Sequence, residues 1–181
     1  MSAGLTPEPQ RSITVRAPAK VNLHLGVGSP RPDGFHPLDT VFQAIGLYDD
    51  VRASDGRGSV VFEPASYLGD VVLPDADDNI IAHAARLLAE TAPDALGLAA
   101  VDLLVQKRIP VAGGMAGGSA DAAATLVALD RLWALGTDDP ELLLLAARLG
   151  SDVPFSLVGG TAHGTGRGDL LRPVPDLATW W

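Results

Sequence analysis

Apolar and polar residues alternate along much of the first third of the chain, and this two-residue period predicts β-strands rather than helices. The expected strands are, in chain order, 13–17, 21–27, 40–47, 50–53 and 59–63. The first two are expected to pair with each other across a connection at Pro18. Residues 29–37 contain the turn dipeptide Asp33-Gly34 and therefore predict a loop.

A helical spacing of apolar residues begins after Asp78-Asn79, which predicts a capped helix that runs to about Thr91. Its buried face is expected to hold Ile80, Ile81, Ala84, Leu87 and Leu88. The remaining expected elements are a strand at 99–106, helices at 119–134 and 140–149, and a glycine-rich hairpin at 158–174. Because strands and helices are mixed without strict alternation, the pattern favours an α+β layered fold over a doubly wound sheet.

The pattern divides the chain into one main domain with a short segment at either end. Residues 1–12 are polar and contain proline, which predicts a disordered tail. Residues 13–175 hold all the expected strands and helices. Residues 176–181 end in Trp180-Trp181, and large apolar side chains usually need a partner to bury against. We therefore expect the first residues of a second domain there; the alternative is that the two rings fold back onto the main body.

The composition is that of an acidic globular protein, with 181 residues, 47% hydrophobic residues and a net charge of -9. That charge argues against a nucleic-acid-binding protein, which normally presents a basic face. The sequence has no cysteine, which excludes disulfides and thiolate metal sites, and its four histidines are scattered without metal-ligand spacing. Neither a membrane-spanning apolar run nor a signal peptide is recognisable, so we expect a cytoplasmic protein. The oligomeric state is not predicted.

The segment with the most specific pattern is 110–124, in which four glycines fall within six residues and an apolar helix follows. A glycine backbone can lie close to an anion, and a helix N-terminus adds N–H donors and a partial positive charge. The segment therefore predicts a cradle for phosphate groups. It is not a P-loop, since no lysine follows the glycines, and it lacks the spacing of a dinucleotide site. The alternative is a flexible loop that lets a helix pack closely on a sheet.

Lysine is rare in this chain, because only Lys20 and Lys107 occur among 13 basic residues. Lysine is a compact point charge and arginine a broad planar fork, so both lysines are candidates for positions that arginine would not fit. Phosphoryl transfer needs a cation and a group that aligns or deprotonates the acceptor hydroxyl. Lys20 is the candidate cation and Asp152 the candidate base. The alternatives are a solvated charge at a strand edge for Lys20 and a turn residue for Asp152.

Five separated motifs in one order carry a family resemblance. They are Pro18-Ala-Lys-Val-Asn-Leu-His-Leu, Asp33-Gly-Phe-His, Asp78-Asn-Ile-Ile, Lys107-Arg-Ile-Pro-Val-Ala-Gly-Gly-Met-Ala-Gly-Gly-Ser-Ala-Asp-Ala-Ala and Gly150-Ser-Asp-Val-Pro-Phe. Together they closely resemble the GHMP family of small-molecule kinases over about residues 12–181. The resemblance implies the N-terminal domain of such a kinase, with the ribosomal protein S5 domain 2-like fold and with the C-terminal domain missing.

The first two motifs point to the branch of the family that uses ATP to phosphorylate the 2-hydroxyl of a cytidine diphosphate methylerythritol, in non-mevalonate isoprenoid precursor biosynthesis. The resemblance implies that Asp152 is the base, with Lys20 beside it. The residues implied for the cytidine pocket are Asn22, Phe35 and His36. The residues implied to bind ATP are Asn79, Ile80 and Lys107 near the adenine, and Pro110, Gly113, Gly114, Gly117, Gly118 and Ser119 along the phosphates. The implied cofactors are ATP and Mg²⁺, with no metal-binding residue assigned, and the implied partner is the small-molecule substrate, with no nucleic acid and no membrane.

Two residues of the glycine segment depart from the family pattern. Ala120 stands where relatives often have a second serine, so one hydroxyl is lost beside the phosphates. Asp121 stands where an asparagine can occur, and it adds negative charge near an anion site. Asp121 is expected either to help hold Mg²⁺ or to cap the following helix.

Three alternatives to this function stay open. Because the family has a second domain that is absent here, the first is a non-catalytic nucleotide-binding fragment. The second is another GHMP kinase, such as a homoserine or mevalonate kinase, which the expected pyrimidine pocket at Phe35 and His36 argues against. The third is an RNA-binding module, which the acidic charge disfavours.

Overall fold

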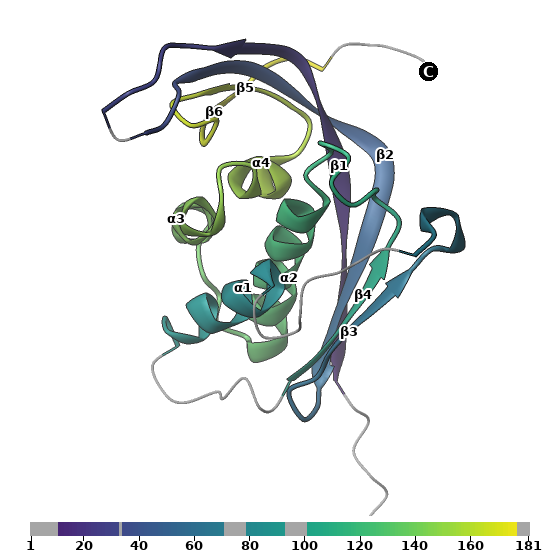
Figure 1. Cartoon of the computed structure of the whole chain (residues 1–181). Coiled ribbons are helices and arrows are strands. Elements are labelled where there is room, and N and C mark those ends of the chain that lie inside the picture. Colours follow the sequence, from purple (N-terminus) through teal and green to yellow (C-terminus); the bar gives the residue numbers. More distant parts are fainter. Residues whose placement is uncertain (1–10, 33, 71–78, 93–100, 177–181) are drawn as a thin grey trace, which may run out of the picture.

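A computed structural model describes residues 11–32, 34–70, 79–92 and 101–176 of the chain (Figure 1). Several sequence expectations lie outside these residues, namely those for residues 1–10 of the predicted tail 1–12, Asp33, Asp78 and Trp180-Trp181. The described residues form one sheet with helices on one of its faces, which confirms the expected α+β fold (Figure 1). Among these residues, no helix combines the length and the apolar composition that a membrane span requires.

Two long strands, β1 (Ser12–Val27) and β2 (Leu38–Asp55), form an antiparallel pair. The sequence predicted four shorter strands in this region, and that prediction was wrong. Pro18 pairs with Tyr48 while Ala19 pairs with Ile45, so two residues of β2 bulge out of the ladder at this point. Proline is tolerated at bulges and at sheet edges, so Pro18 bends β1 without ending it.

The opposite edge of β2 is shared between two other strands. The remaining strands are β3 (Val60–Pro64), β4 (Val101–Lys107), β5 (Thr161–Thr165) and β6 (Leu170–Pro173). β4 pairs with residues 50–55 of β2, and β5 pairs with residues 40–43. β3 lies parallel to β4, and β6 forms the predicted hairpin with β5. We call residues 44–49 the split edge, because β4 and β5 diverge there.

The helices and one short turn lie between the strands in the chain. They are the 3-10 turn η1 (Ser66–Leu68), α1 (Ile80–Ala89), α2 (Gly117–Trp133), α3 (Asp139–Leu149) and α4 (Val153–Val158). The predictions of α1 and α3 are confirmed, with side-chain caps from Asn79 and Asp138. α2 begins at Gly117 rather than at Ser119. α4 was not predicted; its Pro154 lies in the first turn, where proline costs no helical hydrogen bond.

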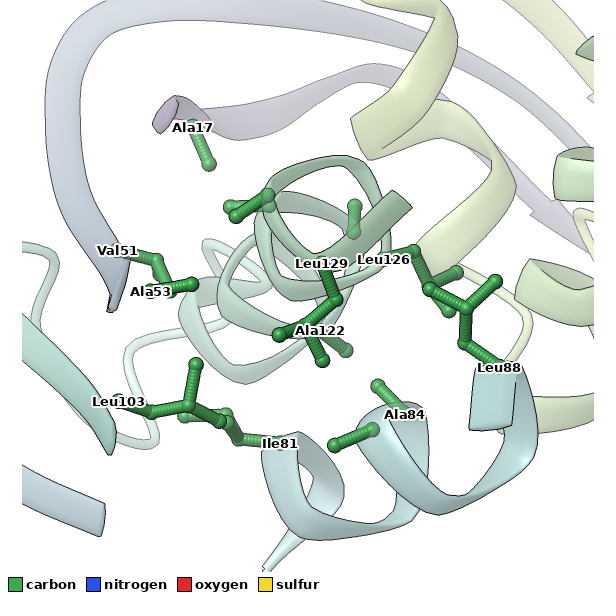
Figure 2. Packing of buried hydrophobic residues seen from close by; sticks show 14 of the residues in the cluster. Ala17, Val51, Ala53, Ile81, Ala84, Leu88, Leu103, Ala122, Leu126 and Leu129 are labelled. Carbon is green, nitrogen blue, oxygen red and sulfur yellow. The ribbon is translucent and has the colours of Figure 1, made fainter. Parts of the chain in front are cut away.

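α2 is the central helix of the core, and ten of its 17 residues are buried. A helix that is buried around most of its circumference packs against neighbours on several sides. Figure 2 shows α2 residues between side chains of α1 and of the sheet, the labelled ones being Ala17, Val51, Ala53, Ile81, Ala84, Leu88, Leu103, Ala122, Leu126 and Leu129. This packing fixes the N-terminal end of α2, where the glycine-rich loop joins it.

Candidate functional site

A cavity of about 340 Å³ lies beside residues 108–116, the loop that joins β4 to α2. All nine residues that the sequence assigned to ATP line this cavity. They come from the start of α1, the end of β4, the loop itself and the start of α2. Phe62 of β3 and Ile81 of α1 add apolar surface to its walls. The structure therefore brings the predicted nucleotide residues together around one hollow, which we call the loop cavity.

The N-terminus of α2 opens on the loop cavity without a side-chain cap. Ala116 takes the cap position in a left-handed conformation, with φ 56°, and makes no capping hydrogen bond through its side chain. The first N–H groups of an α-helix have no partner within the helix, and that end carries a partial positive charge. The backbone here is therefore arranged to receive an anion.

The loop holds two alanines in a conformation that alanine rarely adopts. Ala112 has φ 58° and Ala116 has φ 56°, while the left-handed conformation suits glycine, as at Gly114 with φ 72°. Each left-handed alanine costs on the order of 1–2 kcal/mol. Such strain persists only where the surroundings stabilise it. Interactions outside the loop must therefore hold it in shape.

Three buried charged side chains, Asp49, Lys107 and Asp121, supply such interactions beneath the loop. Asp49, on the split edge of β2, accepts hydrogen bonds from Lys107 Nζ and from the backbone N–H groups of Arg108 and Ile109. Lys107 Nζ also donates to Asp121 Oδ2 on α2, at 2.7 Å. This charged cluster ties both ends of the loop to β2. Lys107 lines the loop cavity as expected, but its ammonium is bound to the two carboxylates.

The structure contradicts one of the two expectations for Asp121. Ala116 holds the cap position, so the expectation that Asp121 caps α2 was wrong. Burial raises the pKa of Asp121 to about 8; the Lys107 ammonium opposes this shift, and the nearby Asp49 carboxylate adds to it. Its Oδ1 atom has no hydrogen-bond partner among the described residues. Asp121 is thus a buried partner of Lys107 in the wall of the loop cavity.

The structure brings Lys20, Asp152 and Asn22 together. The Lys20 ammonium lies 3.4 Å from Asp152 Oδ2 and donates to Asn22 Oδ1 at 2.7 Å. Asn22 in turn donates to Thr40 Oγ1 at 2.7 Å, and Thr40 donates to the backbone oxygen of His24. Lys20 is 8% exposed, whereas the Asp152 side chain is 31% exposed. A fixed, buried ammonium therefore stands beside a carboxylate that a ligand can reach.

One backbone hydrogen bond links this pair to the loop cavity. The Lys20 N–H donates to the carbonyl oxygen of Met115 at 3.1 Å, and Met115 lines the loop cavity. Beneath the pair, the Phe42 ring lies 5.3 Å from Lys20 Nζ and packs against Phe155 of α4. Asp152 directly precedes α4, and α4 packs on α2. The Lys20–Asp152 pair and the loop cavity are therefore neighbouring parts of one site.

Phe35 and His36 lie between β1 and β2 in the chain, on the loop that joins these two strands (Figure 1). Phe35 is 51% exposed, and the Arg167 guanidinium lies 5.4 Å from its ring centre. His36 Nδ1 is 2.9 Å from the carbonyl oxygen of Gly28. Because a carbonyl oxygen only accepts, Nδ1 carries the proton and Nε2 of the neutral ring is left as an acceptor. Neither residue lines the loop cavity.

Sequence reasoning missed Asp49 and Thr40, which hold Lys107 and Asn22 in place. For Asp49 a signal was present: an acidic residue follows an apolar run in a strand. A buried carboxylate needs a charged or hydrogen-bonded partner, so this position could have been matched with one of the two lysines. Thr40 gave no comparable signal, because threonine is ordinary in strands.

Comparison with known proteins identifies relatives that match about nine tenths of the chain. Residues 79–160 match the family described as "GHMP kinases N terminal domain". A Nocardioides sp. protein named 4-diphosphocytidyl-2-C-methyl-D-erythritol kinase is 60% identical over 169 residues, covering 92% of this chain and 56% of the relative. A Nocardia farcinica protein of the same name is 54% identical over 162 residues, covering 90% and 51%. The chain thus spans about half the length of the curated relatives it matches.

Among solved structures, too, this chain matches about half the length of its neighbours. The crystal structure of a 4-(cytidine 5'-diphospho)-2C-methyl-D-erythritol kinase superposes with a TM-score of 0.70 at 37% identity, over 90% of this chain and 55% of that one. A homoserine kinase from Cytophaga hutchinsonii superposes with a TM-score of 0.63 at 21% identity, over 97% and 55%. At the lower identity the likeness shows the fold alone.

Proposed function

Because the chain belongs to the GHMP kinase family, we propose that it forms the ATP-binding part of a kinase that phosphorylates the 2-hydroxyl of 4-diphosphocytidyl-2-C-methyl-D-erythritol. The substrate is named in the relatives that share 54% and 60% identity with this chain. The motifs that set this branch apart, Pro18-Ala-Lys-Val-Asn-Leu and Asp33-Gly-Phe-His, are both present. The reaction belongs to isoprenoid precursor biosynthesis and draws on the ATP of the cytoplasm.

The loop cavity is the proposed site of ATP. Its uncapped helix N-terminus and glycine backbone suit the phosphate groups, and its apolar walls at Phe62 and Ile80 suit the adenine ring. A Cβ on Gly117 would lie 3.0 Å from the Ile109 side chain, so only glycine allows this close packing beneath the phosphates. ATP supplies the transferred phosphoryl group when bound. Mg²⁺ is proposed to enter with the phosphates, since the described residues contain no group of three or more His, Asp or Glu placed to hold a metal.

Asp152 is the proposed base and Lys20 the proposed cation. The 2-hydroxyl oxygen would form its bond to the γ-phosphorus of bound ATP while the bond from that phosphorus to the bridging oxygen breaks and ADP leaves. The proton of the hydroxyl would pass to the Asp152 carboxylate. The Lys20 ammonium, 3.4 Å from that carboxylate, neutralises negative charge that develops on the transferred group. Asn22 holds the ammonium in place before the substrate binds, so little reorganisation accompanies the reaction.

Phe35 and His36 are the proposed contacts of the cytosine ring. The exposed face of Phe35 offers a surface for stacking. The hydrogen bond from Nδ1 to Gly28 leaves Nε2 of His36 as an acceptor, which suits the amino group of cytosine, a donor. A pocket with this chemistry prefers a pyrimidine to homoserine or mevalonate.

A second candidate function is nucleotide binding without turnover. It is favoured by one observation, that the chain spans about half the length of its curated relatives. Phosphoryl transfer requires the two reactants in close alignment, and a misplacement of about 1 Å can cost 10²-fold in rate. We therefore expect the 181-residue chain by itself to bind nucleotide weakly and to show little turnover.

One observation supports the kinase proposal most: the Lys20 N–H donates a hydrogen bond to the carbonyl oxygen of Met115, so the proposed cation and base are neighbours of the loop cavity. The test is a fusion in which this chain replaces the matching part of the Nocardioides relative. The fusion is expected to phosphorylate the cytidine substrate and neither homoserine nor mevalonate, and an Asp152→Asn fusion is expected to keep nucleotide binding without turnover. Bound nucleotide with no transfer in the unmodified fusion would support the second candidate, and transfer to homoserine or mevalonate would overturn the proposed substrate.

A further inference from the structure

Two carboxylates share one ammonium in the charged cluster beneath the loop cavity. Asp49, Lys107 and Asp121 are 0%, 3% and 2% exposed, so water does little to screen their charges. Asp49 uses both oxygens, with two backbone N–H groups on Oδ1 and Lys107 on Oδ2. Asp121 accepts through Oδ2 alone, and its Oδ1 has no partner among the described residues. With both carboxylates ionised the cluster carries one net negative charge, and Asp121 is the member with room for a proton.

Other charged groups around α2 are directed elsewhere. The elements packed on α2 turn apolar side chains toward the core, among them Val51, Ile81, Leu88, Ala146 and Val153. The charged residues within α1 and α3 are exposed. On β1, the Lys20 ammonium is bound to Asn22 and Asp152. Asp50 follows Asp49 on β2 and forms ion pairs with Arg16 and Arg108. Lys107 and Asp49 are therefore the charged groups that act on Asp121 within the described part of the chain.

The charged cluster lies directly under the proposed phosphate site. Asp121 itself lines the loop cavity, together with Gly117, Gly118 and Ser119. A Cβ on Gly117, the first residue of α2, would lie 3.2 Å from Lys107 Nζ. A phosphate group in the cavity would thus bring new negative charge close to a carboxylate that is buried and incompletely paired. In a low-dielectric interior, such like charges repel strongly.

We propose that binding of a nucleotide in the loop cavity is coupled to uptake of one proton by Asp121. The coupling rests on the proposed function and deepens it, because it names how the site accommodates the charge of the phosphates. A proton from solvent neutralises the Asp121 carboxyl, while Oδ2 stays available to accept from Lys107. The Lys107–Asp49 ion pair then remains, with no net charge beneath the loop. Asp121 is in this sense a positioning residue, which acts on the ligand through the charge of the site.

The direction of the pH dependence follows from linkage. The nucleotide favours the protonated carboxyl, so affinity is fully present below the pKa of free Asp121 and falls as the pH rises above it. Burial raises the pKa of Asp121 to about 8. When binding takes up one proton, the affinity falls about tenfold for each pH unit above the pKa of the free group. The nucleotide is therefore expected to bind about tenfold more weakly at pH 9 than at pH 7.

The experiment is calorimetry of ADP binding to the 181-residue chain at pH 7, 8 and 9, in two buffers of different ionisation enthalpy. The difference between the buffers counts the protons taken up; the phosphates of ADP, with a second pKa near 6, add little above pH 8. Wild type is expected to approach one proton per ADP at pH 9. Asp121→Asn keeps an acceptor for Lys107 and is expected to bind ADP without proton uptake and without the fall in affinity. The control is Asp130→Asn, the same change farther along α2 at a residue outside the loop cavity, which should keep wild-type coupling.

The titration of the wild-type chain tests the coupling of ADP binding to proton uptake even where a variant fails to fold. Binding of ADP that takes up no proton at pH 9 would overturn the inference and leave the proposed function standing. The same conclusion follows if a folded Asp121→Asn chain shows wild-type uptake. No ADP binding at any pH would overturn the proposed function of the loop cavity, and this inference with it.

Discussion

Replacing Gly117 with alanine is expected to destabilise the folded chain, whereas the same change at Gly118 is not. A Cβ at Gly117 would lie 3.0 Å from Ile109 Cγ2 and 3.2 Å from Lys107 Nζ. Ile109 is fully buried, and Lys107 is held by two carboxylates, so neither can move aside freely. A Cβ at Gly118 would meet Ile80 Cγ2 at 3.8 Å, an ordinary contact distance.

The size of the effect follows from two opposing contributions. Forcing an extra methyl into a well-packed site costs roughly 1–3 kcal/mol. Replacing glycine by alanine in a helix stabilises the folded state by about 0.5–1 kcal/mol. The free energy of unfolding of Gly117→Ala is therefore expected to fall by up to about 2.5 kcal/mol, which lowers Tm by as much as roughly 10 °C for a domain of this size. Gly118→Ala keeps only the favourable contribution, so its Tm is expected to stay level or rise.

Thermal unfolding of the two variants, followed by circular dichroism without ligand, measures this difference independently of any activity. The two changes are chemically identical and adjacent on α2, so helix propensity cancels in the comparison. Equal Tm values for the two variants would refute the reasoning, because they would show that the space beneath Gly117 relaxes at no cost.

The other predictions concern single groups. In the fusion, Asp152→Asn is expected to lower kcat by about 10²–10⁴-fold with little change in nucleotide affinity, and near wild-type kcat would exclude Asp152 as the base. Lys20→Arg is expected to inactivate the fusion although it keeps the charge, because a planar guanidinium does not fit between Asn22 and Asp152; full activity would make Lys20 dispensable. His36→Ala is expected to raise KM for the cytidine substrate far more than for ATP, and equal changes in both would place His36 outside the pyrimidine pocket. Hydrogen bonds from the backbone and side chain of residues 57–59 hold the pKa of Asp102 at about 2, so its contribution to stability is present above pH ~4 and lost as the pH falls toward 2. Urea unfolding from pH 5 to pH 2 should show a shallower loss in Asp102→Asn, and identical slopes would contradict this.

The hydrophobic pattern predicted the order of most elements but not the places where strands end. Interruptions of the alternation at Pro18 and after Leu47 look like strand ends in the sequence. In the structure both strands continue, with a bulge at residues 46–47 of β2 next to the pairing of Pro18, and a partner strand is not visible in a local pattern. The start of α2 was misplaced for a similar reason: the sequence analysis began this helix at Ser119, while the loop brings Ala116 into the cap position.

In the candidate site, too, a motif of neighbouring residues was easier to interpret than a contact between residues far apart in the sequence. The residues predicted to bind ATP lie together around the loop cavity, and most of them are contiguous in the sequence, where a motif can be recognised. Asp49 was missed because its partner Lys107 lies 58 positions away. Periodicity tells which residues are buried, and composition tells which charges are scarce, but neither tells which charge a buried lysine meets.

The scarcity of lysine has a physical explanation in the structure. Both lysines are buried, at 8% and 3% exposure, whereas every arginine is exposed or half-buried. Lys107 fits between two carboxylates under Gly117, and Lys20 fits between Asn22, Asp152 and the Phe42 ring. Each site surrounds a single point of positive charge, and a guanidinium spreads the same charge over a larger plane. Arginine suffices at the surface of this chain because space does not limit it there. Lysine remains at the two places where the charged group must occupy a small volume, and these two places flank the loop that we propose binds phosphate.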